Sequence, residues 1–177
     1  MKSVFKKCYL FLRVSAIMMP FSRRALSEKR RWKGTENIMI IESFSAQDTY
    51  RIGYELGSGA QKGGIFCLGG DLGVGKTVFT QGFAKGLGIE EAVSSPTFTI
   101  IQEYEGGKLP LYHFDVYRIA DLDEMEEIGY EDYFYGDGVC LIEWAELIGE
   151  LLPGNRTTVT IRKDLSKGFD YREITVE

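Results

Sequence analysis

The feature that most constrains the fold of this chain is a glycine-rich turn at residues 70–77, which read Gly-Asp-Leu-Gly-Val-Gly-Lys-Thr. The segment matches the pattern GxxxxGK[ST] and lies between a wholly apolar run, Ile65–Leu68, and a stretch with the periodicity of an amphipathic helix. Glycines let several backbone N–H groups point into one turn, and the following helix adds its unpaired N-terminal donors and the positive end of its dipole. The motif in this context predicts a site for the phosphates of a nucleotide.

Two side chains at the end of this P-loop motif have specific expected roles. Lys76 is long enough to reach the β- and γ-phosphates, and the Thr77 hydroxyl is suited to bind Mg²⁺. Backbone donors for the phosphates are expected from the loop residues Asp71, Leu72, Gly73, Val74 and Gly75.

Strand-like and helix-like segments alternate from Ile38 onward. Apolar or β-branched runs predict strands at 38–44, 65–68, 98–104, 109–117, 139–142, 157–162 and 171–176. Helical patterns cover 46–57, 76–86, 121–135 and 144–152. The order predicts an α/β chain with a three-layer α/β/α P-loop NTPase fold, whose mixed sheet has a parallel core extended by an antiparallel hairpin and edge strands.

Residues 1–37 differ in composition from residues 38–177, which we expect to form one P-loop domain. The first segment has ten Lys or Arg and two Asp or Glu, a net charge of +8, whereas the domain carries −13. A signal peptide, a basic membrane-surface helix and a poorly ordered extension before an internal start at Met39 are alternative interpretations. We favour the extension, because Arg13 interrupts the apolar run and no clear cleavage site follows.

Composition narrows the cellular setting. The three cysteines are odd in number and have no CxxC spacing, which favours a reducing, cytoplasmic location over a disulfide framework or a zinc site. No run approaches the roughly 20 apolar residues that span a bilayer, so no membrane role is expected for the domain. Because its surface charge is acidic, the domain is a poor candidate for binding nucleic acid directly.

Two acids are candidates to accompany the P-loop. P-loop enzymes place a carboxylate at the end of a second apolar strand, facing the metal. Asp115 ends the run that begins at Leu111, and Glu143 follows Val139–Ile142. Either acid can bind Mg²⁺ while the other acts through water, and either can instead be a capping or solvated loop residue. Lys76, Asp115 and Glu143 are therefore the candidate catalytic residues.

Other polar and aromatic residues near these acids have two interpretations each. Thr97 lies in the Ser95-Pro96-Thr97 loop, where related folds carry a nucleotide-sensing switch, and is a candidate contact of the γ-phosphate or Mg²⁺; a plain turn is the alternative. His113 alternates with apolar residues and is interpreted as a structural histidine. Trp144, beside the acid at 143, is more typical of a core residue than of a ligand contact.

The segments GDLGVGKT, SPTF, HFDVYR and IEW, with an acidic helix before the last, resemble the TsaE family, also called YjeE, of small P-loop ATPases. The resemblance covers about residues 39–177, in the family's order and spacing. Ala145 stands where many members have proline, and the residues before Met39 have no counterpart in the family pattern.

The resemblance implies roles for individual residues. It implies that Leu72–Thr77 bind the phosphates of ATP and that Thr77 and Glu143 bind Mg²⁺. Asp115 and Trp144 would be needed for activity. Contacts around the adenine would come from Ala46, Thr49 and Tyr171.

It also implies a function, which is Mg²⁺-dependent ATP hydrolysis in support of N6-threonylcarbamoyladenosine formation at tRNA adenosine 37, beside the anticodon. The partners would be the catalytic subunit of the threonylcarbamoyl-transferase and its paralogous partner subunit, with tRNA contacted only through them. Hydrolysis would be slow alone and faster in the complex. The acidic segment 121–132 suits docking onto a basic protein surface, and a solvated helix face is the alternative.

Two other functions are compatible with a P-loop. One is a small-molecule kinase, although no arginine-rich lid follows residue 119. The other is a nucleotide-gated binding module that does not hydrolyse its ligand. Phosphate release and transfer to small acceptors distinguish the three.

Overall fold

The computed structural model describes residues 30–33 and 38–177. Within the predicted N-terminal extension it describes strand β1 (Arg30–Lys33), which sequence patterns did not suggest and which pairs antiparallel with β2 (Ile38–Ser43). The rest of that extension lies outside the described residues, so its separation from the domain stays a prediction.

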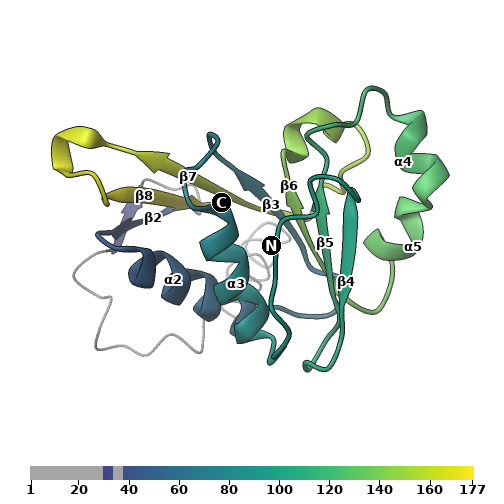
Figure 1. Cartoon of the computed structure of the whole chain (residues 1–177), viewed down its shortest axis with the longest axis horizontal. Coiled ribbons are helices and arrows are strands. Elements are labelled where there is room, and N and C mark those ends of the chain that lie inside the picture. Colours follow the sequence, from purple (N-terminus) through teal and green to yellow (C-terminus); the bar gives the residue numbers. More distant parts are fainter. Residues whose placement is uncertain (1–29, 34–37) are drawn as a thin grey trace, which may run out of the picture.

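Eight described strands form one mixed sheet. Beyond β1 and β2 they are β3 (Ile65–Gly69), β4 (Ile101–Tyr104), β5 (Leu111–Asp115), β6 (Val139–Glu143), β7 (Thr157–Lys163) and β8 (Arg172–Val176). Their order is β1-β2-β8-β7-β3-β6-β5-β4, with β7, β3, β6 and β5 parallel and the other neighbours antiparallel (Figure 1). The predicted parallel core with an antiparallel hairpin and edges is confirmed.

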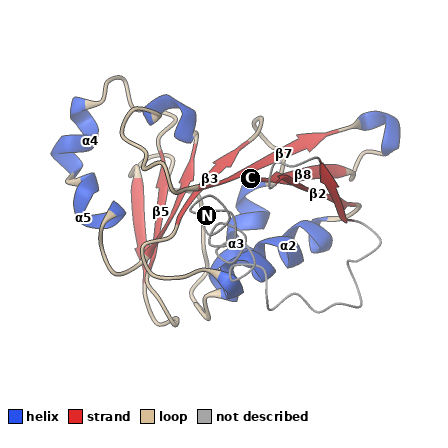
Figure 2. Cartoon of the chain, turned by 180° about the vertical axis from the view of Figure 1, so that it is seen from behind, coloured by secondary structure: helices blue, strands red, loops and turns tan. Residues whose placement is uncertain are grey.

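Helices α2 (Ala46–Gly59) and α3 (Lys76–Gly86) cover one face of this sheet, as Figure 2 also shows from behind. Helix α2 begins where predicted, because the Ser45 side chain accepts a hydrogen bond from the backbone N–H of Asp48. The two helices pack on each other and on the larger apolar core, which includes Phe79 and Phe83 of α3.

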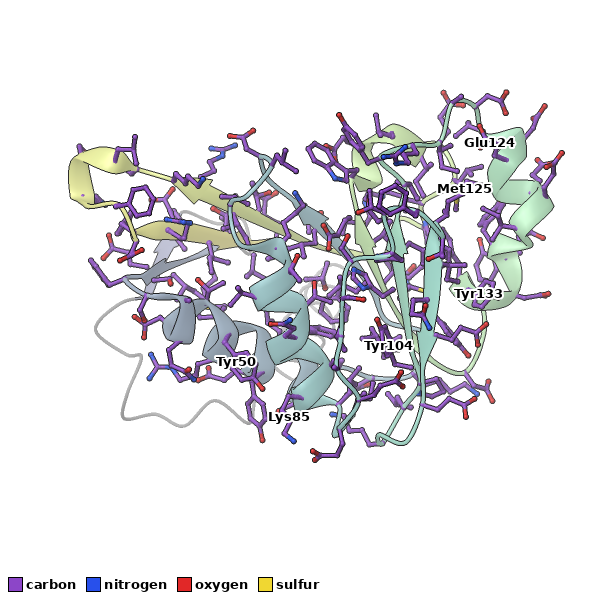
Figure 3. The ribbon with its side chains drawn as sticks, viewed as in Figure 1. Tyr50, Lys85, Tyr104, Glu124, Met125 and Tyr133 are labelled. Atoms are coloured by element: carbon purple, nitrogen blue, oxygen red, sulfur yellow. The ribbon has the colours of Figure 1, made fainter. Side chains whose placement is uncertain are left out.

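The opposite face is covered by α4 (Asp123–Ile128), α5 (Tyr130–Phe134) and the 3₁₀ turn η2 (Ala145–Ile148). Figure 3 shows Met125 and Tyr133 on these helices, beside the β4–β5 end of the sheet. Met125 is fully buried in the second apolar core, and the Tyr133 ring packs against this core. Helices on both faces confirm the three-layer architecture.

Two helices predicted in this layer are shorter than expected. The helix predicted over 121–135 is two helices, because Gly129 adopts a left-handed φ of 72° and ends α4. The helix predicted over 144–152 is the single turn η2, preceded by Trp144 with a φ of 61°. One further 3₁₀ turn, η3 (Leu165–Lys167), connects β7 to β8.

Two cysteines lie inside the apolar layer between the sheet and α4–α5. Burial raises the pKa of Cys67 to about 11 and that of Cys140 to about 12. Both thiols are therefore protonated at neutral pH, and they act as small apolar core residues rather than as nucleophiles. None of the described helices is long and apolar enough to cross a bilayer.

The alternation of side chains along β5 and β6 positions the polar residues of the site. Leu111 and Leu141 belong to the core beneath α2 and α3, whereas their neighbours in sequence face α4 and α5. With a period of two residues, His113, Asp115 and Glu143 point to the same side of the sheet as α3. The fold therefore brings the ends of two strands and the start of α3 together.

Candidate nucleotide-binding site

The P-loop joins β3 to α3 as predicted. Gly75 precedes the first helical residue with a φ of 113°, a conformation that side-chain-bearing residues rarely adopt. Gly70, at the other end of the loop, leaves β3 with a φ of 136°, and a Cβ there would lie 2.5 Å from the carbonyl oxygen of Ile161. Glycine is required at both positions, for backbone conformation and for close packing on β7.

Lys76 crosses this loop instead of extending into solvent. Its Nζ donates hydrogen bonds to the carbonyl oxygens of Gly70, at 2.9 Å, and Asp71, at 3.3 Å. The same atom lies 4.3 Å from the centroid of the Trp144 ring, and the residue is only 6% exposed. A buried ammonium group at the mouth of a P-loop is available to an anion that replaces these carbonyl contacts.

Asp115 and Glu143 end neighbouring parallel strands and are paired in register. The Oδ2 atom of Asp115 accepts hydrogen bonds from Ser95 Oγ, at 2.8 Å, and Thr97 Oγ1, at 2.7 Å, while its Oδ1 accepts from the backbone N–H of Tyr117, at 3.2 Å. Asp115 therefore ties the Ser95–Thr97 loop to the end of β5.

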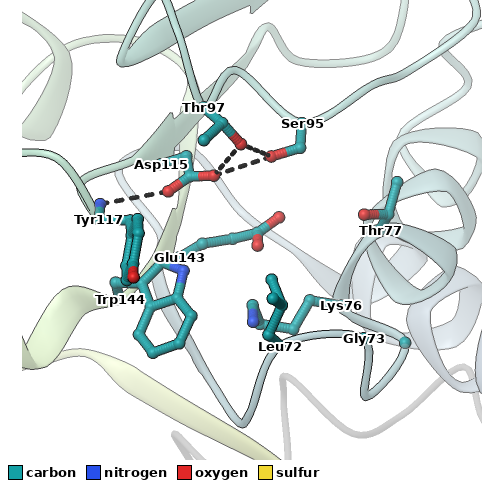
Figure 4. A pocket seen from close by; sticks show the side chains of 11 residues that line it. Leu72, Gly73, Lys76, Thr77, Ser95, Thr97, Asp115, Tyr117, Glu143 and Trp144 are labelled. Atoms are coloured by element: carbon teal, nitrogen blue, oxygen red, sulfur yellow. Dashed lines mark hydrogen bonds between the residues drawn. The ribbon is translucent and has the colours of Figure 1, made fainter.

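Glu143 is 3% exposed, and its Oε1 lies 3.1 Å from Nε2 of His113, which is fully buried. Figure 4 shows the Glu143 carboxylate between Asp115 and Thr77, directed into the space beside the P-loop. The sequence favoured a structural role for His113 and did not reveal this contact with a candidate metal ligand.

These residues surround a pocket of about 330 Å³. Nine of the predicted site residues line it: Leu72, Gly73, Gly75, Lys76, Thr77, Thr97, Asp115, Glu143 and Trp144. Ser95 and Tyr117 also line it, although local sequence indicated no role for either.

The oxygen donors of this pocket fit a hard cation such as Mg²⁺. The Thr77 hydroxyl and the Asp115 and Glu143 carboxylates are the ligand types that Mg²⁺ prefers, and phosphate and water usually complete its coordination. Within residues 30–33 and 38–177 there is no cluster of three or more His, Cys, Asp or Glu side chains that could hold a metal by themselves.

Comparison with known proteins agrees with the geometry. The family model described as "Threonylcarbamoyl adenosine biosynthesis protein TsaE" matches residues 43–174. The chain belongs to the TsaE family. One TsaE relative, named tRNA threonylcarbamoyladenosine biosynthesis protein TsaE of Bacillus subtilis, is 57% identical over 116 residues, covering 66% of this chain and 70% of the relative.

Two further matches extend over more of the chain. The TsaE protein of Treponema pallidum is 47% identical over 138 residues, which are 78% of this chain and 99% of the relative. The crystal structure of Bacillus subtilis YdiB matches with a TM-score of 0.67 and 44% identity, over 81% of this chain and 87% of that chain. The family and the α/β P-loop fold are thereby confirmed.

The residues that the TsaE resemblance assigns to the adenine do not line the pocket. Ala46 is exposed at the start of α2. Thr49 is buried, and its Oγ1 shares a hydrogen bond of 2.8 Å with Ser43 Oγ. A Cβ built on Gly75 would lie 3.9 Å from the Thr49 methyl group, so the start of α2 adjoins the P-loop. Tyr171 is also buried, and its hydroxyl donates to Glu42 Oε1 at 2.8 Å.

The two remaining P-loop residues predicted to contact the ligand also lie outside the pocket lining. Val74 is buried in the larger core, and its carbonyl oxygen accepts a hydrogen bond from Arg172 Nε at 2.7 Å. Asp71 is exposed. Arg172 thus attaches the P-loop to β8, a contact that no local sequence motif reveals.

Trp144 has a backbone conformation that is unusual for a residue with a large side chain. Its φ of 61° lies in the left-handed region, where a side chain adds strain, and its ring lies 5.0 Å from that of Tyr117. The turn directs the indole back over Lys76 and the pocket instead of continuing a helix. Trp144 therefore lines the pocket and also packs against the second apolar core.

Proposed function

We propose that this TsaE-family chain is a Mg²⁺-dependent ATPase that supports N6-threonylcarbamoyladenosine formation in tRNA. One observation carries the proposal: a single pocket combines the P-loop residues Lys76 and Thr77 with two buried acids, Asp115 and Glu143. The relatives named as tRNA threonylcarbamoyladenosine biosynthesis proteins support the assignment of the pathway.

In the proposed reaction, the P-loop N–H groups and Lys76 hold the phosphates and stabilise the negative charge that develops as the terminal phosphoryl group leaves. Thr77 and Glu143 would hold Mg²⁺, which, when bound, neutralises phosphate charge. Asp115, whose carboxylate is held by three hydrogen bonds, is suited to orient the attacking water or to complete the metal site. These residues act chiefly by positioning and electrostatics.

We propose adenine as the base, bound beyond the P-loop between the start of α2 and the region of Tyr171. The proximity of Thr49 to Gly75 supports this placement, because it puts the start of α2 beside the P-loop. The sequence also lacks an NKxD motif of the kind that reads guanine. We expect ADP, but not GDP, to displace a bound ATP analogue in a competition experiment.

The proposed partners are the threonylcarbamoyl-transferase catalytic subunit and its paralogous partner subunit, which would hold the tRNA. A groove of about 400 Å³, lined by Asp121, Glu146 and Glu150 together with Leu147, supports docking to a basic protein surface. The net charge of −13 on residues 38–177 likewise supports indirect rather than direct contact with tRNA.

Phosphate release from ATP tests the proposal. We expect slow release in Mg²⁺, background release in EDTA, and a faster rate when both partner subunits are added, because a partner can complete the charge stabilisation that the pocket lacks when alone. No release under any condition, with ATP still bound, would favour a nucleotide-gated binding module. Transfer of the phosphoryl group to a small metabolite would favour a kinase.

A further inference from the structure

His113 and Glu143 form a buried polar pair on the sheet face that looks toward α3. In the register of β5 and β6, Glu143 lies opposite Asp115. The His113 ring contacts the Glu143 carboxylate from a position two residues before Asp115 on β5. On its other side Glu143 is in register with Leu68, which is 1% exposed and apolar. Among the described residues, His113 is hydrogen-bonded to this carboxylate through its side chain.

The two ring nitrogens of His113 have different surroundings. Nε2 lies 3.1 Å from Glu143 Oε1, whereas Nδ1 is buried and has no hydrogen-bond partner among residues 30–33 and 38–177. A proton on Nδ1 would be a buried donor without an acceptor, which is unfavourable. The contact is therefore best satisfied with a ring proton on Nε2, which is donated to the Glu143 carboxylate.

We propose that His113 is a positioning residue that fixes the Glu143 carboxylate in the direction that faces Thr77 and the pocket. A hydrogen bond from this ring N–H fixes the orientation of the carboxylate, which an apolar side chain at this position could not do. Hydrogen bonds of this kind to a metal-binding carboxylate are known to strengthen metal binding. The inference rests on the proposed role of Glu143 in holding Mg²⁺.

The side-chain length of an amide at position 113 provides the test. In His113→Gln the amide nitrogen can take the place of Nε2, whereas in His113→Asn it is too short to reach Glu143, although both variants bury an amide. His113→Leu adds an apolar replacement. For each folded variant, calorimetry gives the affinity for a non-hydrolysable ATP analogue in Mg²⁺ and in EDTA, and the ratio of the two measures the coupling to Mg²⁺.

We expect His113→Asn and His113→Leu to lower this ratio by about 10-fold, with unchanged affinity in EDTA, and His113→Gln to stay within about 3-fold of the parent. Equal ratios for Asn and Gln, or a loss of affinity also in EDTA, would show a packing role and overturn the inference. If the parent protein does not bind the analogue at all, the proposed function fails first and this inference fails with it.

The ring itself provides a readout that needs no nucleotide. The chain has a single histidine, so a long-range ¹H–¹⁵N spectrum of tag-free protein reports one ring. We expect a proton on Nε2, the ring nitrogen that faces Glu143. A proton on Nδ1 with none on Nε2 would contradict the hydrogen bond to Glu143 and overturn the inference. This spectrum is recorded on the parent protein, so the result does not depend on how well the variants fold.

Discussion

Lys76→Ala is expected to lower phosphate release from ATP by at least about 100-fold, because it removes the ammonium group that stabilises developing charge on the transferred phosphoryl group. Lys76 is 6% exposed and lines the pocket, so water screens its charge poorly. Water that fills the space left in the variant cannot supply the missing positive charge. Steady-state phosphate release at saturating ATP and Mg²⁺ measures the effect.

Lys85→Ala is the matched control, because Lys85 lies on the same helix at its far end from the pocket, with an exposed side chain paired to Glu90 (Figure 3). We expect this variant to keep the parent rate. A parent-like rate in Lys76→Ala, with thermal unfolding unchanged, would mean that the pocket is not where the phosphoryl group is held.

Gly82→Ala is expected to destabilise the protein by about 3 kcal/mol, which corresponds to a fall in Tm of roughly 6–12 °C. A Cβ at Gly82 would lie 2.0 Å from the carbonyl oxygen of Tyr50 in α2, a backbone atom that cannot move aside without separating the helices. The contact is reciprocal, since a Cβ at Gly57 of α2 would lie 2.0 Å from the Phe83 carbonyl oxygen. Glycine lowers the intrinsic stability of a helix, and the close packing of α2 against α3 compensates for this loss of helix stability.

Gly149→Ala serves as the control for this prediction. Gly149 has helical dihedrals, is exposed, and a Cβ there would lie at an ordinary 3.5 Å from the Glu146 carbonyl oxygen. Its unfolding temperature should match or slightly exceed that of the parent, because alanine restricts the unfolded chain. If Gly82→Ala unfolds at the same temperature as Gly149→Ala, the two helices do not pack backbone against backbone.

Local sequence was sufficient for most of the fold because its strands are short, apolar and clearly separated. Ile65–Gly69 and Val139–Glu143 are buried on both faces, and such continuous apolar runs are typical of parallel strands. Helix α2 begins at Ala46, as predicted, and the Ser45 side chain caps it. The acidic stretch 121–135 was harder, because its composition favours helix throughout and only Gly129 marks the break.

The site residues that belong to one local motif could be predicted from the sequence. The residues that come together only in the folded chain were harder to predict. The P-loop is local, so Lys76 and Thr77 could be assigned directly. The contact of His113 with Glu143 joins residues 30 positions apart, and it becomes evident only once strand register is known. Placing His113 two residues before Asp115 on one strand was an available signal, since such residues share a face.

The left-handed turn at Trp144 could not be predicted for a different reason. Aromatic residues rarely adopt a φ of 61°, so sequence preference favours a helix beginning there. The end of β6, the Tyr117 ring and the Lys76 ammonium group surround the indole in its observed position. Such conformations concentrate at functional sites, where surrounding contacts outweigh local preference.

The most direct test of the central claim, that this pocket binds ATP together with Mg²⁺, is isothermal titration calorimetry with a non-hydrolysable ATP analogue. We expect one binding site per chain, an affinity that falls when EDTA replaces Mg²⁺, and loss of the signal in Lys76→Ala but not in Lys85→Ala. Absence of binding heat from the parent protein in Mg²⁺ at several temperatures, or equal heat from both lysine variants, would contradict the account.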